Sequence, residues 1–304
     1  MNANLRPRAL LTGVTGYIGG WLTHDLLQRG WSVEALGRRR STQINIRTHL
    51  YDGTYASVSS AVELSQPDVI FHLASAVSVE HKHEQVADIV SANVTFPALI
   101  LEAMAAHGCW NLVNAGTSWQ HFDGTDIYKP ANLYAATKQS FEDVASFYVD
   151  AHELNVLTLK LFDVYGPADP RAKLLPYLIR SALDGVEVVL SPGEQIIDLV
   201  HVRDVVTAFA MAAERLRSGR RKLESFPVRS GETLSLRELV ACVDSAVGAP
   251  MRVNWGGRPY RAREVMKPWS ATSCLPRWQP AVELREGLLE IVAEARRTSR
   301  PTST

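Results

Sequence analysis

Strand-length apolar runs alternate with longer helical patterns from the first residues of this chain onward. The run that ends at Thr12 is followed by a helical pattern in which Ile18, Leu22 and Leu26 recur every four residues on one face. The run 69–73 is apolar throughout except for one histidine, as in a strand buried on both faces. This order predicts parallel strands joined by right-handed helical crossovers, because parallel neighbours need long connections. The fold class is therefore α/β, with a doubly wound parallel sheet.

A glycine-rich loop, T-G-V-T-G-Y-I-G, joins the first predicted strand to the first helix. Glycines let the backbone turn tightly and approach a pyrophosphate, and the helix N-terminus adds unpaired N–H groups and a partial positive charge. The alternative is a plain glycine-rich turn, but strand, loop and helix stand in the order that a dinucleotide site needs. We therefore expect a Rossmann-type domain whose loop contacts the cofactor through Gly13, Thr15, Gly16, Tyr17, Ile18 and Gly19.

The rest of the chain extends this pattern and then loses it. With 304 residues the chain is too long for a bare dinucleotide domain, and strands and helices no longer alternate cleanly after Pro167. We predict a Rossmann domain at 1–165, to which the chain returns near 196–217, and a smaller, mainly substrate-binding C-terminal lobe at 166–304. The further elements expected are strands at 31–36, 112–114 and 156–162, and helices at 85–107 and 133–149.

Charge, hydropathy and cysteine content exclude several classes. Thirty-two basic residues balance 32 acidic ones, so no global field attracts nucleic acid or a membrane surface, and we expect neither as a partner. No run of 18 apolar residues occurs, which argues against a transmembrane helix, and glycines interrupt the start that a signal peptide would need. Three cysteines without a C-x-x-C pair favour a reducing, cytoplasmic location. No metal site is expected, since His81-Lys82-His83 lacks carboxylate or thiolate support.

The end of the second strand bears on which dinucleotide binds. An acidic residue there suits the ribose of NAD, whereas arginine accommodates the 2′-phosphate of NADP. Here Gly37 is followed by three arginines, so we expect NADPH/NADP, with Arg38 as the main contact and Arg39 beside it. Glu34 on the same strand would instead favour NAD, the cofactor we rank second, and a solvated basic turn is the remaining alternative.

Three residues form the expected catalytic set. Tyr134 and Lys138 stand four positions apart, on one face of a helix, where a lysine cation favours the phenolate and lowers the pKa of a tyrosine. Thr117 follows the strand 112–114, at the edge of the sheet where ligands gather, and its hydroxyl could donate to a substrate carbonyl. Ser118 is the alternative bearer of that role, and loop capping is the alternative for both.

These motifs and several later ones together resemble the extended short-chain dehydrogenase/reductases, in the NAD(P)-dependent sugar-nucleotide epimerase/dehydratase family. Within it the chain is most similar to the nucleotide-sugar 4-ketoreductases. The resemblance covers nearly the whole chain and is carried by the glycine loop, Phe71-His72-Leu73-Ala74, Asn93, the Thr117/Tyr134/Lys138 set, Leu161-Phe162-Asp163-Val164-Tyr165-Gly166-Pro167, Gly193-Glu194-Gln195, His201-Val202-Arg203-Asp204 and Trp278-Gln279-Pro280.

The resemblance implies further contacts, a nucleoside-diphosphate sugar as substrate, and a homodimer. The additional cofactor residues are Asp52, Leu73, Ala74 and Asn93, beside Tyr134 and Lys138. For Asp52, capping of the turn before Gly53 is an equal alternative. The substrate residues are Ser118, Trp119, Asp163, Lys173, Gln195, Arg258 and Arg261. For the segment 258–263, which also holds Arg263, a solvated basic loop is the alternative.

Departures from the family pattern narrow the chemistry. Related dehydratases carry an Asp-Glu pair after the catalytic threonine, and reductases that also epimerise carry a cysteine two positions after it; this chain has Ser118 and Trp119. Ile197 stands where an arginine often precedes Asp198, and Asp163 replaces a frequent asparagine. We expect an NADPH-dependent reduction of the C4 ketone of a nucleotide-linked 4-keto-6-deoxyhexose. The alternatives are an NAD-dependent 4-epimerase, a reductase of a small non-nucleotide ketone or aldehyde, and a non-catalytic NADP-binding protein.

Overall fold

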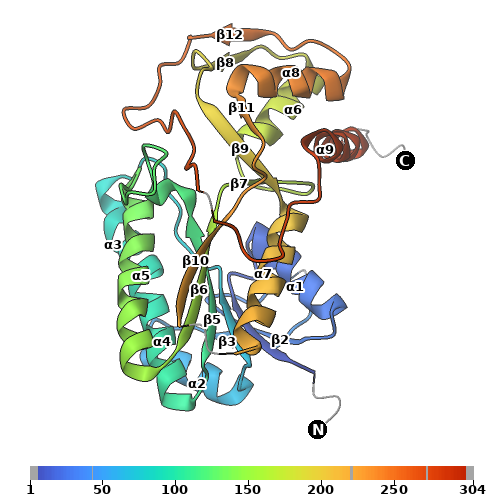
Figure 1. Ribbon diagram of the computed structural model, residues 1–304. Helices are drawn as coiled ribbons and strands as arrows, with labels where there is room; N and C mark the ends of the chain where they lie inside the picture. The colour runs from blue at the N-terminus through green and yellow to red at the C-terminus, as the bar shows by residue number, and fades with distance from the viewer. Residues whose placement is uncertain (1–5, 43, 220–221, 272, 299–304) are drawn as a thin grey trace.

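A seven-stranded parallel sheet forms the centre of the computed structural model, which describes residues 6–42, 44–219, 222–271 and 273–298 (Figure 1). The strand order is β10-β6-β5-β4-β1-β2-β3, and every neighbouring pair is parallel. The strands are β1 (Arg8–Thr12), β2 (Ser32–Gly37), β3 (Thr48–Leu50), β4 (Val69–His72), β5 (Asn111–Thr117), β6 (Asn155–Leu161) and β10 (Leu223–Val228). The predicted doubly wound α/β fold is confirmed.

Alternate residues of each central strand enter two different cores. Leu11 and Phe71 pack with α1 (Tyr17–Gln28) and α7 (Val202–Arg217) on one face. Leu10 and Ile70 pack on the other face with α2 (Tyr55–Ser65), α4 (Phe96–His107) and α5 (Leu133–His152). Burial on both faces explains why these strands are almost uniformly apolar in sequence.

The predicted helix at 85–107 is built from four segments rather than one. They are the 3₁₀ turn η1 (His83–Gln85), α3 (Val86–Val90), the π-helical turn η2 (Ser91–Thr95) and α4. By length and hydropathy the whole stretch His83–His107 also passes as a candidate membrane span, contrary to the expectation that the chain has no such segment. Within this stretch Ile100 and Met104 are fully buried in the protein core. A buried core helix meets the same criteria of length and hydropathy.

The second lobe follows the carboxyl end of β6 and lies at one end of the sheet (Figure 1). Its small sheets are β11-β9-β7 and β12-β8, formed by β7 (Asp163–Tyr165), β8 (Val188–Leu190), β9 (Ile196–His201), β11 (Thr233–Ser235) and β12 (Val253–Trp255). The lobe's helices are α6 (Leu174–Asp184), α8 (Leu236–Val247) and α9 (Leu284–Thr298). The chain returns to the large sheet through α7 and β10, so the return extends to Val228, beyond the range 196–217 expected from sequence.

Candidate active site

The glycine loop forms a tight backbone cradle at the N-terminus of α1. Gly13 has a φ of +79°, and a Cβ there would lie 2.7 Å from the backbone nitrogen of Ala74. Gly16 is the N-cap of the helix, and both Thr15 and Gly16 are exposed at the tip of the loop. The loop, in which the Gly16 N–H donates to the Gly13 carbonyl at 2.9 Å, therefore exposes its tip to a ligand at a helix N-terminus, which fits the pyrophosphate of a dinucleotide.

Two of the residues expected in this loop have other partners. The hydroxyl of Tyr17 donates to the carbonyl of Pro167 at 3.1 Å, and the guanidinium of Arg171 lies 4.6 Å from the centre of its ring. Ile18 packs against the core formed with α1. Both side chains link the loop to the rest of the fold, so any contact they make with a cofactor would come from their backbone.

The segment after β4 is fixed beside the glycine loop by one hydroxyl. Thr12 Oγ1 accepts from the backbone N–H groups of Leu73 and Ala74, both at 3.1 Å, and lies 2.9 Å from His72 Nδ1. Since the Thr12 oxygen accepts twice, its own proton goes to Nδ1, so the ring carries its proton on Nε2. Burial lowers the pKa of His72 well below its usual value, so this histidine is a neutral core residue.

Asn93 joins the same segment to α5. Its Oδ1 accepts from Ser75 Oγ at 2.9 Å and from the backbone of Ala76 at 2.8 Å, while its Nδ2 donates to Thr137 Oγ1 at 3.0 Å. The residue is 1% exposed and lies in the π-helical turn η2, which widens the helix at this point. The structure thus gives Asn93 a supporting position behind the site, and it brings Ser75, which sequence reasoning did not single out, next to the reacting groups.

The basic end of β2 is exposed and its acidic residue is occupied. Among the described residues, the ion pairs do not involve Arg38 or Arg39, and both side chains are exposed. Glu34 lies three residues before the strand end, where its carboxylate is 2.6 Å from His49 Nε2 and 3.9 Å from Arg47 Nε. The Glu34 carboxylate therefore contacts His49 on β3 and Arg47 just before it, and lies away from the end of β2.

Asp52 has the geometry of a turn cap. Its carboxylate accepts from the backbone N–H and the hydroxyl of Thr54 at 2.9 and 2.7 Å, and these bonds lower the pKa of Asp52. Thr54 in turn caps α2. The capping alternative raised for Asp52 thus describes its contacts in the structure.

Thr117, Tyr134 and Ser75 come together at the carboxyl ends of the sheet strands. Thr117 ends β5, and its hydroxyl accepts from the backbone of Trp119 at 3.3 Å, which leaves its own proton free to donate. Tyr134 is buried, and its phenol is influenced by the hydroxyls of Thr117 and Ser75, which lower its pKa. Burial outweighs them and raises the pKa of Tyr134 to about 12.

Lys138 does not act on Tyr134 in the way that its spacing suggested. Only 1% of the residue is exposed, and burial lowers the pKa of Lys138 itself to about 8. The groups that lower the pKa of Tyr134 are the two hydroxyls, not this ammonium. The groups that lower the pKa of Tyr134 thus do not include Lys138, contrary to the expectation from its spacing, and desolvation disfavours the charged form of both residues.

Three of the expected substrate residues lie together next to Tyr134. The ring of Trp119 packs edge-on against Tyr134, with centroids 6.3 Å apart, and Lys173 Nζ is 5.9 Å from the centre of the Trp119 ring. Lys173 Nζ also lies 3.6 Å from Asp163 Oδ1, with both side chains about two-fifths exposed. Ser118, the alternative to Thr117, is buried. An exposed ion pair over a tryptophan can therefore meet polar groups of a substrate.

Within the part of the chain that the structure describes, the remaining expected substrate residues have partners outside this cluster or are exposed. Gln195 exchanges hydrogen bonds with Ser191 Oγ at 3.0 and 3.2 Å. Arg258 is exposed, and Arg261 Nε lies 3.8 Å from Glu264. Arg263 donates to the carbonyls of Ala131 and Pro130 and so ties its loop to the start of α5. That role for Arg263 has no signal in the local sequence, because it depends on a segment 132 residues away.

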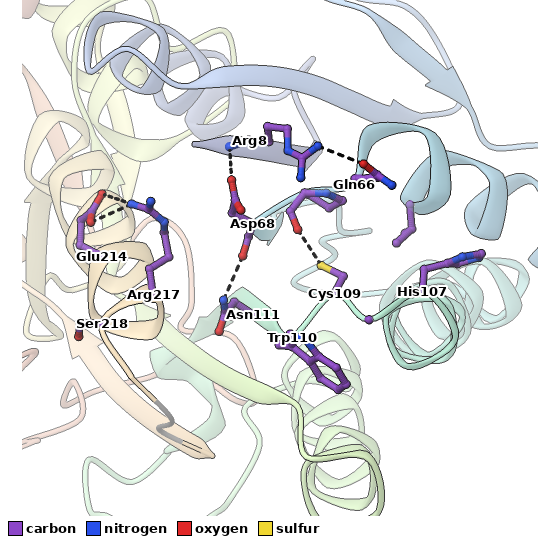
Figure 2. A pocket seen from close by; sticks show the side chains of 13 residues that line it. Arg8, Gln66, Asp68, His107, Cys109, Trp110, Asn111, Glu214, Arg217 and Ser218 are labelled. Atoms are coloured by element: carbon purple, nitrogen blue, oxygen red, sulfur yellow. Dashed lines mark hydrogen bonds and ion pairs between the residues drawn. The ribbon is translucent and has the colours of Figure 1, made fainter. Parts of the chain in front are cut away.

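A cavity of about 640 Å³ lies at the other end of the sheet, where the parallel strands begin (Figure 2). Its wall contains Arg8 at the start of β1, Trp110 and Asn111 at the start of β5, and the ion pair of Arg217 with Glu214 near the end of α7. The cavity thus opens at the amino ends of the parallel strands. Because ligands of such sheets bind at the carboxyl ends, it is separate from the candidate active site.

Comparisons with known proteins find relatives along nearly the whole chain. Residues 9–224 match the model of the NAD dependent epimerase/dehydratase family. CDP-abequose synthase of Salmonella muenchen is 23% identical over 296 residues, which cover 95% of this chain and 98% of that protein. UDP-glucose 4-epimerase of Mycolicibacterium smegmatis is 28% identical over 326 residues, 96% of this chain and 100% of that protein. The solved structure of MoeE5 in complex with UDP-glucose and NAD matches with a TM-score of 0.84 and 26% identity, over 96% of this chain and 99% of that one.

Proposed function

The chain belongs to the NAD dependent epimerase/dehydratase family, and on that premise we propose that it is an NADPH-dependent reductase. Its substrate is a nucleotide-linked 4-keto-6-deoxyhexose, whose C4 ketone it reduces to an alcohol. The family supplies NAD(P)-dependent chemistry on sugar nucleotides, and the similarity to CDP-abequose synthase and to MoeE5 with UDP-glucose supports a nucleoside-diphosphate sugar.

The groups around Tyr134 carry the choice of reaction. Its neighbours Thr117, Ser75 and Trp119 are two hydroxyls and an indole, none of which takes up or releases a proton near neutral pH. Elimination of water, or epimerisation next to the ketone, needs a second acid or base at carbon. Among the described residues, the side chains in contact with Tyr134 include no such second acid or base, which favours plain hydride transfer.

The same geometry indicates which group donates the proton and which groups support that step. When bound, the nicotinamide supplies a hydride to the ketone carbon, and Tyr134 donates its proton to the ketone oxygen. Its high pKa keeps the phenol protonated at neutral pH, as a proton donor must be. Thr117, whose oxygen already accepts from Trp119, can donate to the same ketone oxygen and stabilise the charge that develops there. The charged form of Lys138 stabilises the phenolate left behind.

NADPH is favoured over NAD by the end of β2. Arg38 and Arg39 are exposed there, and Glu34 is engaged by His49, so a 2′-phosphate would find guanidinium groups rather than a carboxylate. The second candidate is an NAD-dependent 4-epimerase. It is supported by the similarity to UDP-glucose 4-epimerase and to MoeE5 with NAD, since that reaction needs the same threonine, tyrosine and lysine.

The remaining proposals concern the substrate lobe and assembly. Arg258 and Arg261 are the cations that we assign to the diphosphate, in place of the arginine that Ile197 replaces. We also propose a cytoplasmic homodimer; exposed apolar side chains on α3 and α5, Val90 and Phe147 among them, support a contact between copies of the chain. Light scattering of the purified protein tests this dimer directly.

A panel of ketosugars tests the reaction. Purified protein is mixed with NADPH or NADH and with CDP-, dTDP-, GDP- or UDP-linked 4-keto-6-deoxyhexoses, and in a separate reaction with UDP-glucose, and cofactor absorbance and products are followed. Oxidation of NADPH with one nucleotide series, with a product that NMR identifies as the 4-hydroxy sugar, supports the proposal. Conversion of UDP-glucose without net cofactor consumption would instead establish the epimerase. A reductase of small ketones would show no competition by free nucleoside diphosphates.

A further inference from the structure

A buried glutamine connects the catalytic threonine to α5. Gln120, in the 3₁₀ turn η3 (Ser118–Gln120), is fully buried, and its Oε1 accepts from the backbone N–H of Thr117 at 3.2 Å. Its Nε2 donates to Glu142 at 2.8 Å and to Gln139 at 2.9 Å. The backbone that carries the Thr117 hydroxyl is therefore fixed through one side chain to Glu142.

Glu142 lies in a buried group of charges that the reaction itself does not use. Its Oε2 lies 3.8 Å from Lys160 Nζ, and Lys160 Nζ lies 3.2 Å from His121 Nε2. His121 Nδ1 faces the carbonyl of Ile127 at 3.3 Å and therefore carries the ring proton, so Nε2 accepts from Lys160. The buried ammonium of Lys160 thus has one carboxylate partner, Glu142, within the part of the chain described. Burial raises the pKa of Glu142, while the lysine and the glutamine bond oppose that shift.

The same carboxylate acts on Lys138, which lies one turn earlier on α5 and on the same face. Burial lowers the pKa of Lys138, and the charge of Glu142 acts in the opposite direction. His72 also acts on this part of the site from β4, but it is buried and neutral. Glu142 is itself faced by Lys160 from β6 and by its exposed neighbour Asp143. The charge of Glu142, one helical turn from Lys138, therefore opposes the effect of burial on this lysine.

From these contacts we propose that Glu142 is a positioning residue, which fixes Thr117 through Gln120 and keeps Lys138 in its charged form. The proposal rests on the reduction by Tyr134 proposed above. It assigns Glu142 no contact with substrate, cofactor or reacting atoms. Its effect should therefore appear in kcat and its pH dependence rather than in KM.

The substitution Glu142→Gln tests the charge, because it preserves the size and one acceptor oxygen for Gln120. We expect the alkaline limb of the kcat profile to move to lower pH by about half a unit or more, with KM unchanged. Asp143→Asn, at the next position on the exposed side of α5, is the matched control and should leave the limb in place. If the single variant does not fold because Lys160 lacks its partner, Glu142→Gln with Lys160→Met removes both charges and keeps the test of Lys138.

A measurement without substrate separates this proposal from the proposed function. Titration of Lys138 is followed by NMR in protein with ¹³C-labelled lysine, and its signal is assigned with Lys138→Met. A lower midpoint in Glu142→Gln than in wild type supports the proposal even if no ketosugar is reduced. An unchanged midpoint overturns it even if the wild type is an active reductase.

The glutamine arm has its own test. Gln120→Met removes the bonds to Thr117 and Glu142 at nearly constant volume, and we expect kcat to fall about tenfold or more with KM unchanged. Unaltered kcat in this variant overturns the positioning of Thr117.

Discussion

Burial shifts the pKa values of Tyr134 and Lys138 in opposite directions and favours the neutral form of both. The pKa of the phenol rises to about 12 and that of the ammonium falls to about 8, because desolvation disfavours the charged form of each. The spacing of the two residues was enough to predict that they share a helix face. It could not predict this balance, which depends on the walls contributed by β4, β5 and the segment after β4.

The pKa of Lys138 predicts how activity depends on pH. Below pH 8 the ammonium is charged and can stabilise the phenolate that forms at Tyr134, whereas above pH 8 it loses its proton. We therefore expect kcat for ketone reduction to be level near pH 7 and to fall as the pH rises through about 8. In Lys138→Arg the guanidinium stays charged, so the limb should move upward, out of this range. A limb at the same pH in both proteins would contradict the assignment.

Removing the phenol oxygen should stop turnover and leave the cofactor bound. Tyr134→Phe lacks the only proton donor proposed for the ketone oxygen, so kcat should fall by roughly 10²–10⁴-fold. The dissociation constant for NADPH, measured by fluorescence titration, should change little. Tyr128→Phe, an exposed tyrosine before α5, is the control. Residual activity near that of the wild type would assign the proton to another group.

Arg38 should decide between the two dinucleotides. An arginine that contacts the 2′-phosphate forms charge-assisted hydrogen bonds, so Arg38→Ala should weaken NADPH binding by about tenfold or more and leave NADH binding nearly unchanged. Arg47→Ala is a useful comparison, because this arginine lies near Glu34 rather than at the strand end. Equal affinity of the wild type for NADPH and NADH would refute the assignment and favour the NAD-dependent alternative.

At the scale of elements, the junction of β1 and α1 was predictable and its close packing was not. The glycine spacing marks a loop between strand and helix, but the reason for Gly13 lies in the approach of the segment after β4. In the same way, the pattern at 85–107 indicates one helix, whereas Asn93 occupies a π-helical turn that brings its amide to Ser75 and Thr137. The spacing of apolar residues along the sequence cannot predict such contacts, because they join distant segments.

Substitution of Gly13 separates backbone conformation from crowding. Gly13→Ala adds a Cβ that would lie 2.7 Å from the nitrogen of Ala74, in a residue with a φ of +79°. Gly30→Ala has a similar φ of +81° but no atom within 4 Å of its Cβ. We expect Gly30→Ala to lose about 1 kcal/mol of stability from its unfavourable φ, and Gly13→Ala to lose more, because its Cβ also meets backbone, and to lose NADPH affinity as well. Similar NADPH affinities in the two variants would show that the cradle is not a cofactor site.

At the scale of the whole molecule, the five inner strands of the large sheet were predictable, whereas its edge strands β3 and β10 and the second lobe were not. The lobe's short strands show why. Its strands β7, β8, β11 and β12 each have three residues, too few for a period of two to be recognised. Buried polar contacts between distant segments join the lobe to the large sheet, and no periodic sequence pattern marks them. In these, Asp198 on β9 accepts from Arg229 and Ser230, which follow β10, and Arg229 donates onward to the carbonyl of Trp269.

The Asp198 carboxylate should therefore be a main support of the joint between the lobes. Its side chain is fully buried, 3.0 Å from Arg229 Nε, and accepts from the backbone of Ser230 at 2.8 Å and of Gly231 at 3.2 Å. Asp198→Asn replaces one acceptor oxygen by a donor and leaves a mostly buried guanidinium without its counterion. Breaking a buried pair in this way costs about 3–5 kcal/mol, so the free energy of unfolding in urea should fall by about that amount.

An exposed pair provides the comparison for Asp198. Asp25 and Arg29 form an ion pair at 2.6 Å across one turn on the surface of α1, and Asp25→Asn should cost less than about 1 kcal/mol. If Asp198→Asn were as mild, the joint would depend on apolar packing around Trp269 and Phe162 instead. If it is severe, Arg229→Met with Asp198→Leu, which removes both charges together, should recover part of the loss, because neither buried ion is then left unpaired.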